Sequence, residues 1–346
     1  MNPINERRWR QFKRNKRGYY SLWIFLTLFG ISLCAELIAN DRPVVMYHQG
    51  ELWFPVLASY SEQEIGGTLP SEATYWDPFV QNLIEESGGW MIWPIIPFNY
   101  RTPDMYIEQP APAPPSRRHW LGTDDGAKDT VARLIYGFRL SVLFGLALTT
   151  IATSIGITVG ALQGYFGGLV DLFGQRIVEI WTGLPILLLL IVLASIVEPN
   201  VFWLLGTLAA FSWMTVVGLV RAEFLRTRNF EYVRAATALG DSDLSIIFRH
   251  VLPNAMTAAL TFLPFILSGA VTILTALDFL GFGLPAGSPS LGELLAQGKQ
   301  NLHAPWLGLT GFVTVGVMLT LLIFVGEAVR DAFDPRRTMV ASGIAP

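Results

Sequence analysis

Residues 229–254 read NFEYVRAATALGDSDLSIIFRHVLPN, a polar, helix-forming island between two apolar stretches. Each of these stretches is long enough to cross a bilayer. A hydrophilic loop of this length costs more ordering entropy than a short hairpin, which indicates that the loop has a purpose of its own. The island and its flanks therefore predict a membrane protein that crosses the bilayer several times.

The loop carries the start and stop signals of two short helices. Asn229 can cap the first helix, and Gly240 suits the left-handed residue at its end. Asp241 or Ser242 can cap the second helix, and Pro253 limits how far that helix continues. We expect two helices that meet at a glycine elbow.

One apolar stripe is expected on the second of these helices. Leu244, Ile247, Phe248 and Val251 follow the spacing i, i+3, i+4 and i+7. The stripe can dock into the groove of a partner protein or pack against the helices of its own chain. Spacing alone favours neither alternative, because amphipathic helices interrupted by glycine are common.

The composition is that of a bilayer protein. Of the 346 residues 52% are hydrophobic and 15% are charged, whereas soluble domains carry about 25% charged residues. Six runs without charge, each at least 18 residues long, predict six transmembrane helices. The runs are 18–35, 140–170, 180–197, 199–220, 251–277 and 304–326. Glu36 stands where a signal peptide would need a small residue, so we expect the first helix to stay uncleaved.

Basic residues predict the orientation, because Lys and Arg collect on the cytoplasmic side. They cluster before the first run, in the 229–254 loop with its flanks, and in the C-terminal tail. Residues 41–118 instead hold ten acids and four basic residues. We therefore expect both termini and the loop in the cytoplasm, and residues 41–118 outside.

Several function classes are disfavoured by the sequence. Cys34 is the single cysteine, so no intrachain disulfide can form, and the net charge of −3 does not suggest nucleic acid as a partner. Residues 292–300 lack the spacing of a phosphate-binding loop, and no nucleophile motif or zinc motif is present. We expect neither an enzyme nor a bound metal or cofactor.

The loop resembles the cytoplasmic coupling loop of ABC importer permeases, written E-A-A-x3-G-x9-I-x-L-P. Arg234 stands in the Glu position and His250 in the Ile position. The residues that match in register are Ala235, Ala236, Gly240, Leu252 and Pro253. By this resemblance Glu231, Arg234 and Leu244 join those five residues as the site that couples to an ATPase.

Three further segments resemble the dipeptide and oligopeptide permeases of this family. Residues 119–139 resemble an outer motif, G-T-D-x-x-G-R-D, in which Gly122, Thr123, Asp124 and Asp129 match, while Ala127 and Lys128 depart from it. Residues 277–285 and 326–335 resemble two later motifs, so the likeness covers about two thirds of the chain. Three segments are similar to Yej-type subunits, which are associated with microcin C uptake. They are the Trp-rich outer insertion, residues 221–230 and residues 287–295.

The resemblance implies an all-α polytopic fold, a MetI-like type I permease core with a large periplasmic insertion after the first of six helices. The expected parts are a basic cytoplasmic tail, the first helix, the insertion, a five-helix permease domain with the coupling loop, and a cytoplasmic tail. In that order they span 1–18, 19–40, 41–137, 138–331 (loop 223–254) and 332–346.

The implied function is a permease subunit in the inner membrane of a bacterium, forming half of a path for short peptides and microcin C-like peptide-nucleotides. The implied partners are a second permease subunit, ABC ATPase subunits or a fused double ATPase, a periplasmic peptide-binding protein and membrane lipid. An alternative is a secondary transporter driven by an ion gradient. That alternative would need inverted repeats and midplane acids, which the sequence does not show convincingly.

Other candidate residues lie near the ends of the apolar runs. Asp278 and Glu179 are candidates to line the path, where a carboxylate could meet the ammonium group of a peptide. His119 with the nearby Asp residues fits no EF-hand spacing, and helix capping is the expected role of these acids. The insertion either receives a delivery protein or stabilises the outer face, and its aromatic content does not decide between the two.

Overall fold

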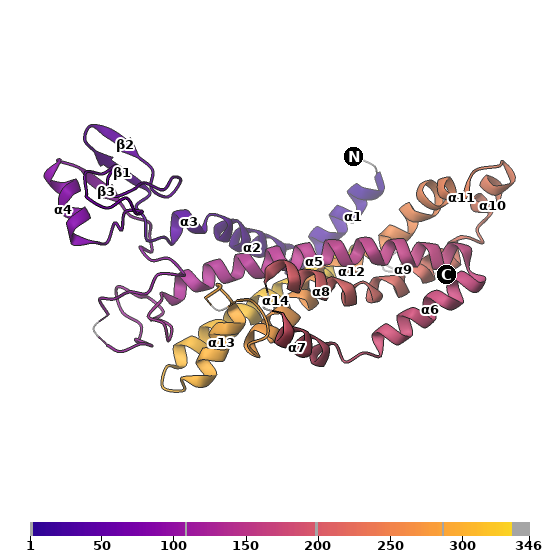
Figure 1. The fold of residues 1–346 in the computed structure, drawn as a ribbon. Helices are drawn as coiled ribbons and strands as arrows, with labels where there is room; N and C mark the ends of the chain where they lie inside the picture. The colour runs from indigo at the N-terminus through magenta and orange to yellow at the C-terminus, as the bar shows by residue number, and fades with distance from the viewer. Residues whose placement is uncertain (1–2, 108, 198–199, 286, 334–346) are drawn as a thin grey trace.

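The computed structural model of the protein describes residues 3–107, 109–197, 200–285 and 287–333. Its body is a long helical bundle, with a small folded insertion at one end and the 229–254 loop at the opposite end (Figure 1). Most of the expected C-terminal tail, residues 334–346, lies outside the described residues.

The first hundred residues form short helices and a sheet. The elements are α1 (Pro3–Arg14), α2 (Lys16–Leu33), α3 (Ala35–Ile38), β1 (Val45–His48), β2 (Glu51–Trp53), α4 (Pro78–Glu86) and β3 (Trp90–Ile92). Phe12 of α1 packs on Ala328 and Ala332, near the far end of the chain. Helix α1 therefore lies against the end of the last helix, α14.

The rest of the described chain is helical. The first group is α5 (Thr130–Phe166), α6 (Gly168–Thr182), α7 (Ile186–Ile196), α8 (Val201–Ser212) and α9 (Met214–Thr227). The second group is α10 (Glu231–Ala238), α11 (Asp243–Ser245), the π-helix η1 (Ile246–Val251), α12 (Leu252–Phe279), α13 (Leu291–Gln300) and α14 (Pro305–Phe333).

A stripe of glycines brings α5 against α9. A Cβ at Gly156 would lie 2.7 Å from the Trp213 carbonyl oxygen, and one at Gly164 would lie 2.7 Å from that of Arg221. Side chains at these positions would force the helices apart, so glycine permits close packing in lipid. The buried Val216, Val220 and Phe224 of α9 then build one core with η1 and the start of α12.

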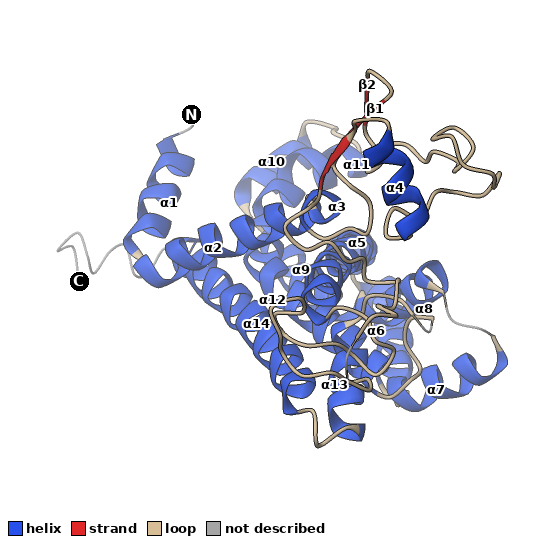
Figure 2. Ribbon diagram, turned by 90° about the vertical axis from the view of Figure 1, so that its left-hand side faces the viewer, coloured by secondary structure: helices blue, strands red, loops and turns tan. Residues whose placement is uncertain are grey.

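The insertion contains the strands, which the all-α expectation missed. Its antiparallel sheet has the order β2-β1-β3, and Figure 2 shows it beside α4. Met46 of β1 packs with Val80 and Ile84 of α4 on the buried side of the sheet. Strands of three or four residues carry too short an alternation to be recognised in the sequence. The insertion is a small α+β unit with its own core.

The third apolar run, 180–197, is broken where one continuous helix was expected. Helices α6 and α7 meet at a bend of 70°. Pro185 lies in this bend, and proline provides no amide hydrogen and restricts the residue before it, here Leu184. The bend turns α7 away from the line of α6, as Figure 1 shows.

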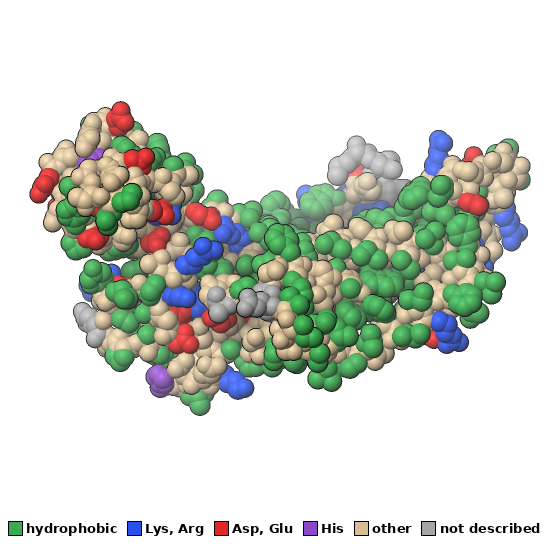
Figure 3. Space-filling view, viewed as in Figure 1, with side chains coloured by type: hydrophobic (Ala, Val, Ile, Leu, Met, Phe, Trp, Pro, Cys, Tyr) green, Lys and Arg blue, Asp and Glu red, His purple; other side chains and the backbone are tan. Residues whose placement is uncertain are grey.

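Four helical segments within the described residues are long and apolar enough to cross a membrane, or five if the bent α6–α7 pair is one span. The four are Thr130–Phe166, Val201–Thr227, Asp243–Phe279 and Pro305–Phe333. Figure 3 shows hydrophobic side chains along the bundle and charged side chains gathered toward its two ends. The predicted count of six spans is not reached by this criterion, because α2 does not satisfy it.

Candidate functional site

The 229–254 loop, for which the resemblance implies a coupling role, begins at the end of α9. The Phe230 amide donates to the Thr227 carbonyl at 3.0 Å, which turns the chain into α10. Phe230 occupies the N-cap position without a side-chain cap. The prediction that Asn229 caps this helix is wrong, because its side-chain amide instead donates to the Leu225 carbonyl of α9 at 3.3 Å.

The glycine elbow is confirmed. Gly240 has φ +85°, in the left-handed region that side chains enter only with strain. The Gly240 amide donates to Thr237 at 3.1 Å, and the Asp241 amide donates to Ala236 at 3.2 Å. These two bonds close the end of α10 and reverse the chain.

The second helix starts as predicted and ends elsewhere. Ser242 caps α11, accepting from the Ser245 amide at 3.4 Å. The prediction that Pro253 limits this helix is wrong, because the helical path continues from α11 through η1 into α12. Pro253 lies in the first turn of α12. We attribute the continuation to the π-turn, whose wider hydrogen-bond pattern accommodates a residue without an amide hydrogen.

The expected apolar stripe is divided between two faces. Ile247 and Val251 are buried in the core that α9 and α12 build. Leu244 and Phe248 are each 64% exposed, and Leu239 at the elbow is 87% exposed. We call Leu239, Leu244 and Phe248 the outward apolar face. Packing on the chain itself is therefore confirmed for Ile247 and Val251, and docking of the exposed side into a partner stays a prediction.

The remaining predicted loop residues also separate by burial. Ala236 is buried between α10 and η1. Leu252 is half-buried. Glu231, Arg234 and Ala235 are exposed on α10. Glu231, Arg234 and Ala235 are therefore accessible on the same loop as the outward apolar face.

Three residues that sequence reasoning missed hold the loop to α5. The Tyr165 hydroxyl donates to Asp243 at 2.7 Å, at the start of α11. The Arg228 guanidinium donates to the carbonyls of Gly164 and Tyr165 at 3.4 and 3.3 Å, where α5 ends. A cation at the last carbonyls of a helix is favourable. The loop is consequently exposed at its tip and braced at its base.

The outer motif lies at the opposite end of the bundle and is closed. Gly122 has φ +73°, and a Cβ there would lie 2.5 Å from the Ala113 carbonyl oxygen. The Thr123 hydroxyl accepts from the Ala113 amide at 2.8 Å. The Trp306 indole nitrogen donates to the Thr123 carbonyl at 3.5 Å. The motif thus ties Ala113, in the later part of the insertion, to the start of α14.

A buried ion network extends from the motif. Arg133 of α5 is 1% exposed and pairs with Asp124. It also pairs with Glu293 of α13 at 2.8 Å and donates to the Ser288 carbonyl at 3.4 Å. Asp124 in turn accepts from the amides of Gly126 and Lys128 at 2.9 and 2.8 Å. Buried charges are tolerated when they are paired in this way.

The helix-capping role expected for these acids is confirmed for Asp129, whereas Asp124 pairs with Arg133 instead. Asp129 caps α5, accepting from the Ala132 amide at 2.8 Å, and its other oxygen lies 2.8 Å from His119 Nδ1. His119 Nε2 lies 3.1 Å from Asp104, which also pairs with Arg118 at 2.8 Å. Burial lowers the pKa of His119, but the hydrogen bonds of Asp129 and Asp104 outweigh burial and leave that pKa above its usual value.

The two path candidates have different surroundings. Asp278 is buried, accepting from the Leu284 amide at 2.7 Å and from the Ser290 hydroxyl at 2.5 Å. Its carboxylate therefore holds the turn between α12 and α13. Glu179 lies exposed on α6 and pairs with Arg176 at 2.5 Å. That either residue faces a path stays a prediction.

The chain matches two protein families. The first is described as "Binding-protein-dependent transport system inner membrane component" and covers residues 156–339, more than half of the chain. The second, described as "N-terminal TM domain of oligopeptide transport permease C", covers residues 6–49. The second match includes α2, the helix that the membrane-span criterion leaves out.

Curated relatives match over almost the whole length. The inner membrane ABC transporter permease protein YejE of Escherichia coli is 58% identical, over 98% of this chain and 99% of the relative. The peptidoglycan transport system permease protein YejE of Agrobacterium fabrum is 54% identical, over 98% and 94%. A solved structure titled "Inward facing conformations of the MetNI methionine ABC transporter" covers 58% of this chain and 96% of that chain, with 18% identity and a TM-score of 0.47.

These matches agree with the motifs and with the apolar helices that carry them. The expected relationship to the oligopeptide branch and to Yej-type subunits is confirmed by the two full-length relatives and the N-terminal family. The chain belongs to the family of binding-protein-dependent inner membrane components, the permease subunits of ABC importers.

Proposed function

We propose that this chain forms half of a path for short peptides across the bacterial inner membrane and couples it to ATP hydrolysis in a separate subunit. The support for peptides is the N-terminal family, whose description names oligopeptide transport. The relative from Agrobacterium is named for peptidoglycan, a polymer that contains short peptides. Peptide-nucleotides of the microcin C kind fall within the same proposed substrate range.

The outward apolar face carries this proposal. Leu239, Leu244 and Phe248 are exposed on a loop that Arg228 and Tyr165 brace against α5. Apolar side chains on a polar end of the bundle gain free energy when a partner covers them. The partner we propose is an ABC ATPase, either separate subunits or a fused double ATPase.

The proposed topology has six spans, adding α2 and the bent α6–α7 pair to the four long segments. A cavity of about 900 Å³ is lined by Arg8 of α1, Phe230 beside α10 and Arg330 of α14, which places these three elements at one end. Basic residues at this end favour the cytoplasm. Residues 1–18 and 332–346 are then cytoplasmic tails, 19–40 the first span, 41–137 the periplasmic insertion and 138–331 the permease domain.

A second permease subunit is proposed to cover α6 and α7. Helix α6 has no buried residue, and Leu190 is the buried residue of α7. Their exposed apolar side chains lie along a part of the bundle that packs little against the rest of this chain. Glu179 lies on α6, so this arrangement would bring it toward the path between two subunits. A periplasmic peptide-binding protein would deliver substrate on the side of the insertion.

The coupling mechanism follows from the contacts of the loop. When the ATPase dimer closes, it would move the outward apolar face. Asp243 and Arg228 would transmit this movement to the end of α5 through Tyr165 and the last carbonyls. The continuous path from α11 through η1 would transmit it to α12. Two long helices of the bundle would then tilt together and change the access to the path.

The test is peptide uptake by the assembled transporter in vesicles, driven either by ATP or by a proton gradient. We expect uptake with ATP alone, and we expect Gly240→Asp to insert normally yet uncouple hydrolysis from uptake. Gly88→Asp is the matched control, since both glycines have positive φ and open space around the Cβ position. Uptake that needs the proton gradient and not ATP would support a secondary transporter instead.

A further inference from the structure

The sheet of the insertion has a buried face and an outward face. Met46 of β1 is buried against α4, and His48, two residues later, is buried as well. Successive side chains of a strand point to opposite sides of the sheet, so Val45 and Tyr47 point away from α4. Both are half-buried rather than buried, because the rest of the described chain leaves this side of the sheet uncovered.

The register of the strands places apolar side chains together on the outward side. Tyr47 pairs with Leu52 of β2 on one side and with Trp90 of β3 on the other. Val45 pairs with Ile92 in the next row. The exposed fractions are 58% for Leu52, 47% for Trp90 and 53% for Ile92. We call Val45, Tyr47, Leu52, Trp90 and Ile92 the sheet face.

The centre of the sheet face is aromatic and ordered. The rings of Tyr47 and Trp90 stack with centroids 6.0 Å apart and planes at 16°. Aromatic side chains of this kind lose little conformational entropy when a partner covers them, and they are enriched in protein interfaces. A contiguous exposed apolar surface on a folded unit indicates an interaction site.

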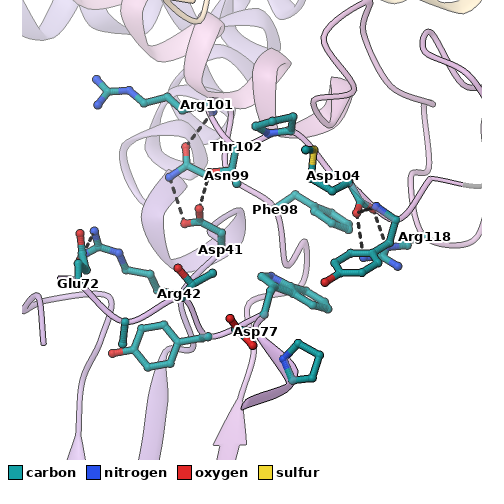
Figure 4. Close-up of a pocket in the computed structure, with 18 residues that line it drawn as sticks. Asp41, Arg42, Glu72, Asp77, Phe98, Asn99, Arg101, Thr102, Asp104 and Arg118 are labelled. Atoms are coloured by element: carbon teal, nitrogen blue, oxygen red, sulfur yellow. Dashed lines mark hydrogen bonds and ion pairs between the residues drawn. The ribbon is translucent and has the colours of Figure 1, made fainter. Parts of the chain in front are cut away.

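The insertion that carries the sheet face is fastened to the bundle. The Tyr136 hydroxyl of α5 donates to the Ala39 carbonyl at 3.0 Å, where the chain enters the insertion. Figure 4 shows Asp104 paired with Arg118 beside a pocket of the insertion, and Asp104 also contacts His119 of the outer motif. A protein that docks on the sheet face would therefore take a defined position relative to the bundle.

The charge around the sheet face restricts what can cover it. Glu51 begins β2, Glu85 and Glu86 end α4 shortly before β3, and all three are exposed. Residues 41–118 hold ten acids and four basic residues, and Figure 3 shows acidic side chains over the insertion. This charge disfavours contact with an anionic lipid surface and favours a protein with basic residues around its contact surface.

We propose that the sheet face is the docking surface for the periplasmic peptide-binding protein, whose basic residues would meet Glu51, Glu85 and Glu86. The inference rests on the proposed function, because it assigns a surface of this chain to the partner that delivers the peptide. The sheet face lies at the end of the bundle opposite the 229–254 loop, on the side where the proposed topology has peptide arrive. The insertion would then receive a delivery protein, the first of the two roles that its sequence left open.

The first experiment measures ATP-driven peptide uptake by the assembled transporter in vesicles while the concentration of the purified binding protein is varied. We expect Trp90→Ala to raise the concentration that gives half-maximal uptake about tenfold, at an unchanged melting temperature. Leu52→Ala should act in the same direction. Phe79→Ala is the matched control, because Phe79 is 48% exposed on α4, which packs on the other side of the sheet.

A second measurement identifies what covers the sheet face. The photo-crosslinking amino acid benzoylphenylalanine replaces Leu52 in the assembled transporter, which is irradiated during uptake. We expect a crosslink to the binding protein, and we expect none when the same amino acid replaces Phe79. A product with the second permease subunit, with a second copy of this chain or with lipid alone would overturn the inference.

The uptake data also separate the inference from the proposed function. If the wild type takes up peptide with ATP and the binding protein while Trp90→Ala needs no more binding protein than the wild type, only the inference fails. An equal shift in Trp90→Ala and Phe79→Ala would overturn it too. If the wild type takes up no peptide, the proposed function fails.

Discussion

The outer motif and the coupling loop are both recognisable in the sequence, yet the structure gives them opposite characters. In the outer motif Thr123, Asp124 and Asp129 are almost completely buried, and hydrogen bonds or ion pairs occupy their polar groups. In the coupling loop Leu244 and Phe248 are exposed and uncovered. The comparison teaches that a motif can mark residues that hold the chain together or residues that the chain leaves exposed. Burial separates the two.

The largest effect is expected from removing the centre of the closed network. Arg133→Ala would leave Asp124 buried without its cation, and breaking a buried pair in this way costs roughly 3–5 kcal/mol. Thermal unfolding in detergent measures the loss. Arg234→Ala, on the exposed face of α10, is the control and should change stability by less than about 0.5 kcal/mol. Equal losses in both variants would contradict the distinction between the two regions.

The coupling loop should show the reverse pattern, with binding lost and stability kept. We expect Leu244→Ala or Phe248→Ala to weaken ATPase binding by roughly 2 kcal/mol, about thirtyfold in Kd. Ile247→Ala, one residue away and buried, should instead lower stability. Measuring both the affinity for the ATPase and the melting temperature in these three variants tests the comparison. A loss of stability in the Phe248 variant would place its side chain in the protein's own core.

The closed motif should also respond to pH through His119. A His whose pKa is higher in the folded state stabilises that state below the unfolded pKa of about 6.5, and the contribution is lost as pH rises through the folded pKa. We therefore expect the melting temperature to fall above about pH 6.5. His119→Asn should flatten this dependence, whereas His303→Asn, exposed on the same side, should leave it unchanged.

The smallest effect concerns a departure from the family motif. Ala127 has φ +59°, a conformation that favours glycine, and the family has glycine there. We expect Ala127→Gly to stabilise the chain by about 1 kcal/mol or less. The same substitution inside α10, Ala235→Gly, should destabilise it by about 0.5–1 kcal/mol. Melting temperatures that move in the same direction would show that backbone conformation does not set the sign.

Features with a local cause could be predicted from the sequence. Gly240 ends α10 because its neighbours demand a left-handed residue, and Gly156, Gly160 and Gly164 lie where α5 meets α9. Asp129 caps α5 by accepting a hydrogen bond from the amide of Ala132, three residues later, which is also a local interaction. The membrane runs follow from composition and needed no knowledge of distant contacts.

Features that depend on distant contacts could not be predicted. Glu293 lies far from Arg133 in the chain, so their ion pair could not be predicted from the spacing of residues in the sequence. The division of the 244–251 stripe depends on which side of η1 meets α9, and the path past Pro253 depends on a π-turn. The small sheet of the insertion is held by Met46 against α4, another contact that strand length did not reveal.

The most direct measurement is co-purification of the ATPase with three forms of this chain from their native membrane: wild type, Phe248→Asp and Glu85→Gln, an exposed substitution in the insertion. Our account predicts that wild type and Glu85→Gln retain the ATPase in equal amounts. It predicts that Phe248→Asp loses the ATPase while its melting temperature is unchanged. Full retention of the ATPase by Phe248→Asp would contradict the assignment of the outward apolar face as the coupling surface.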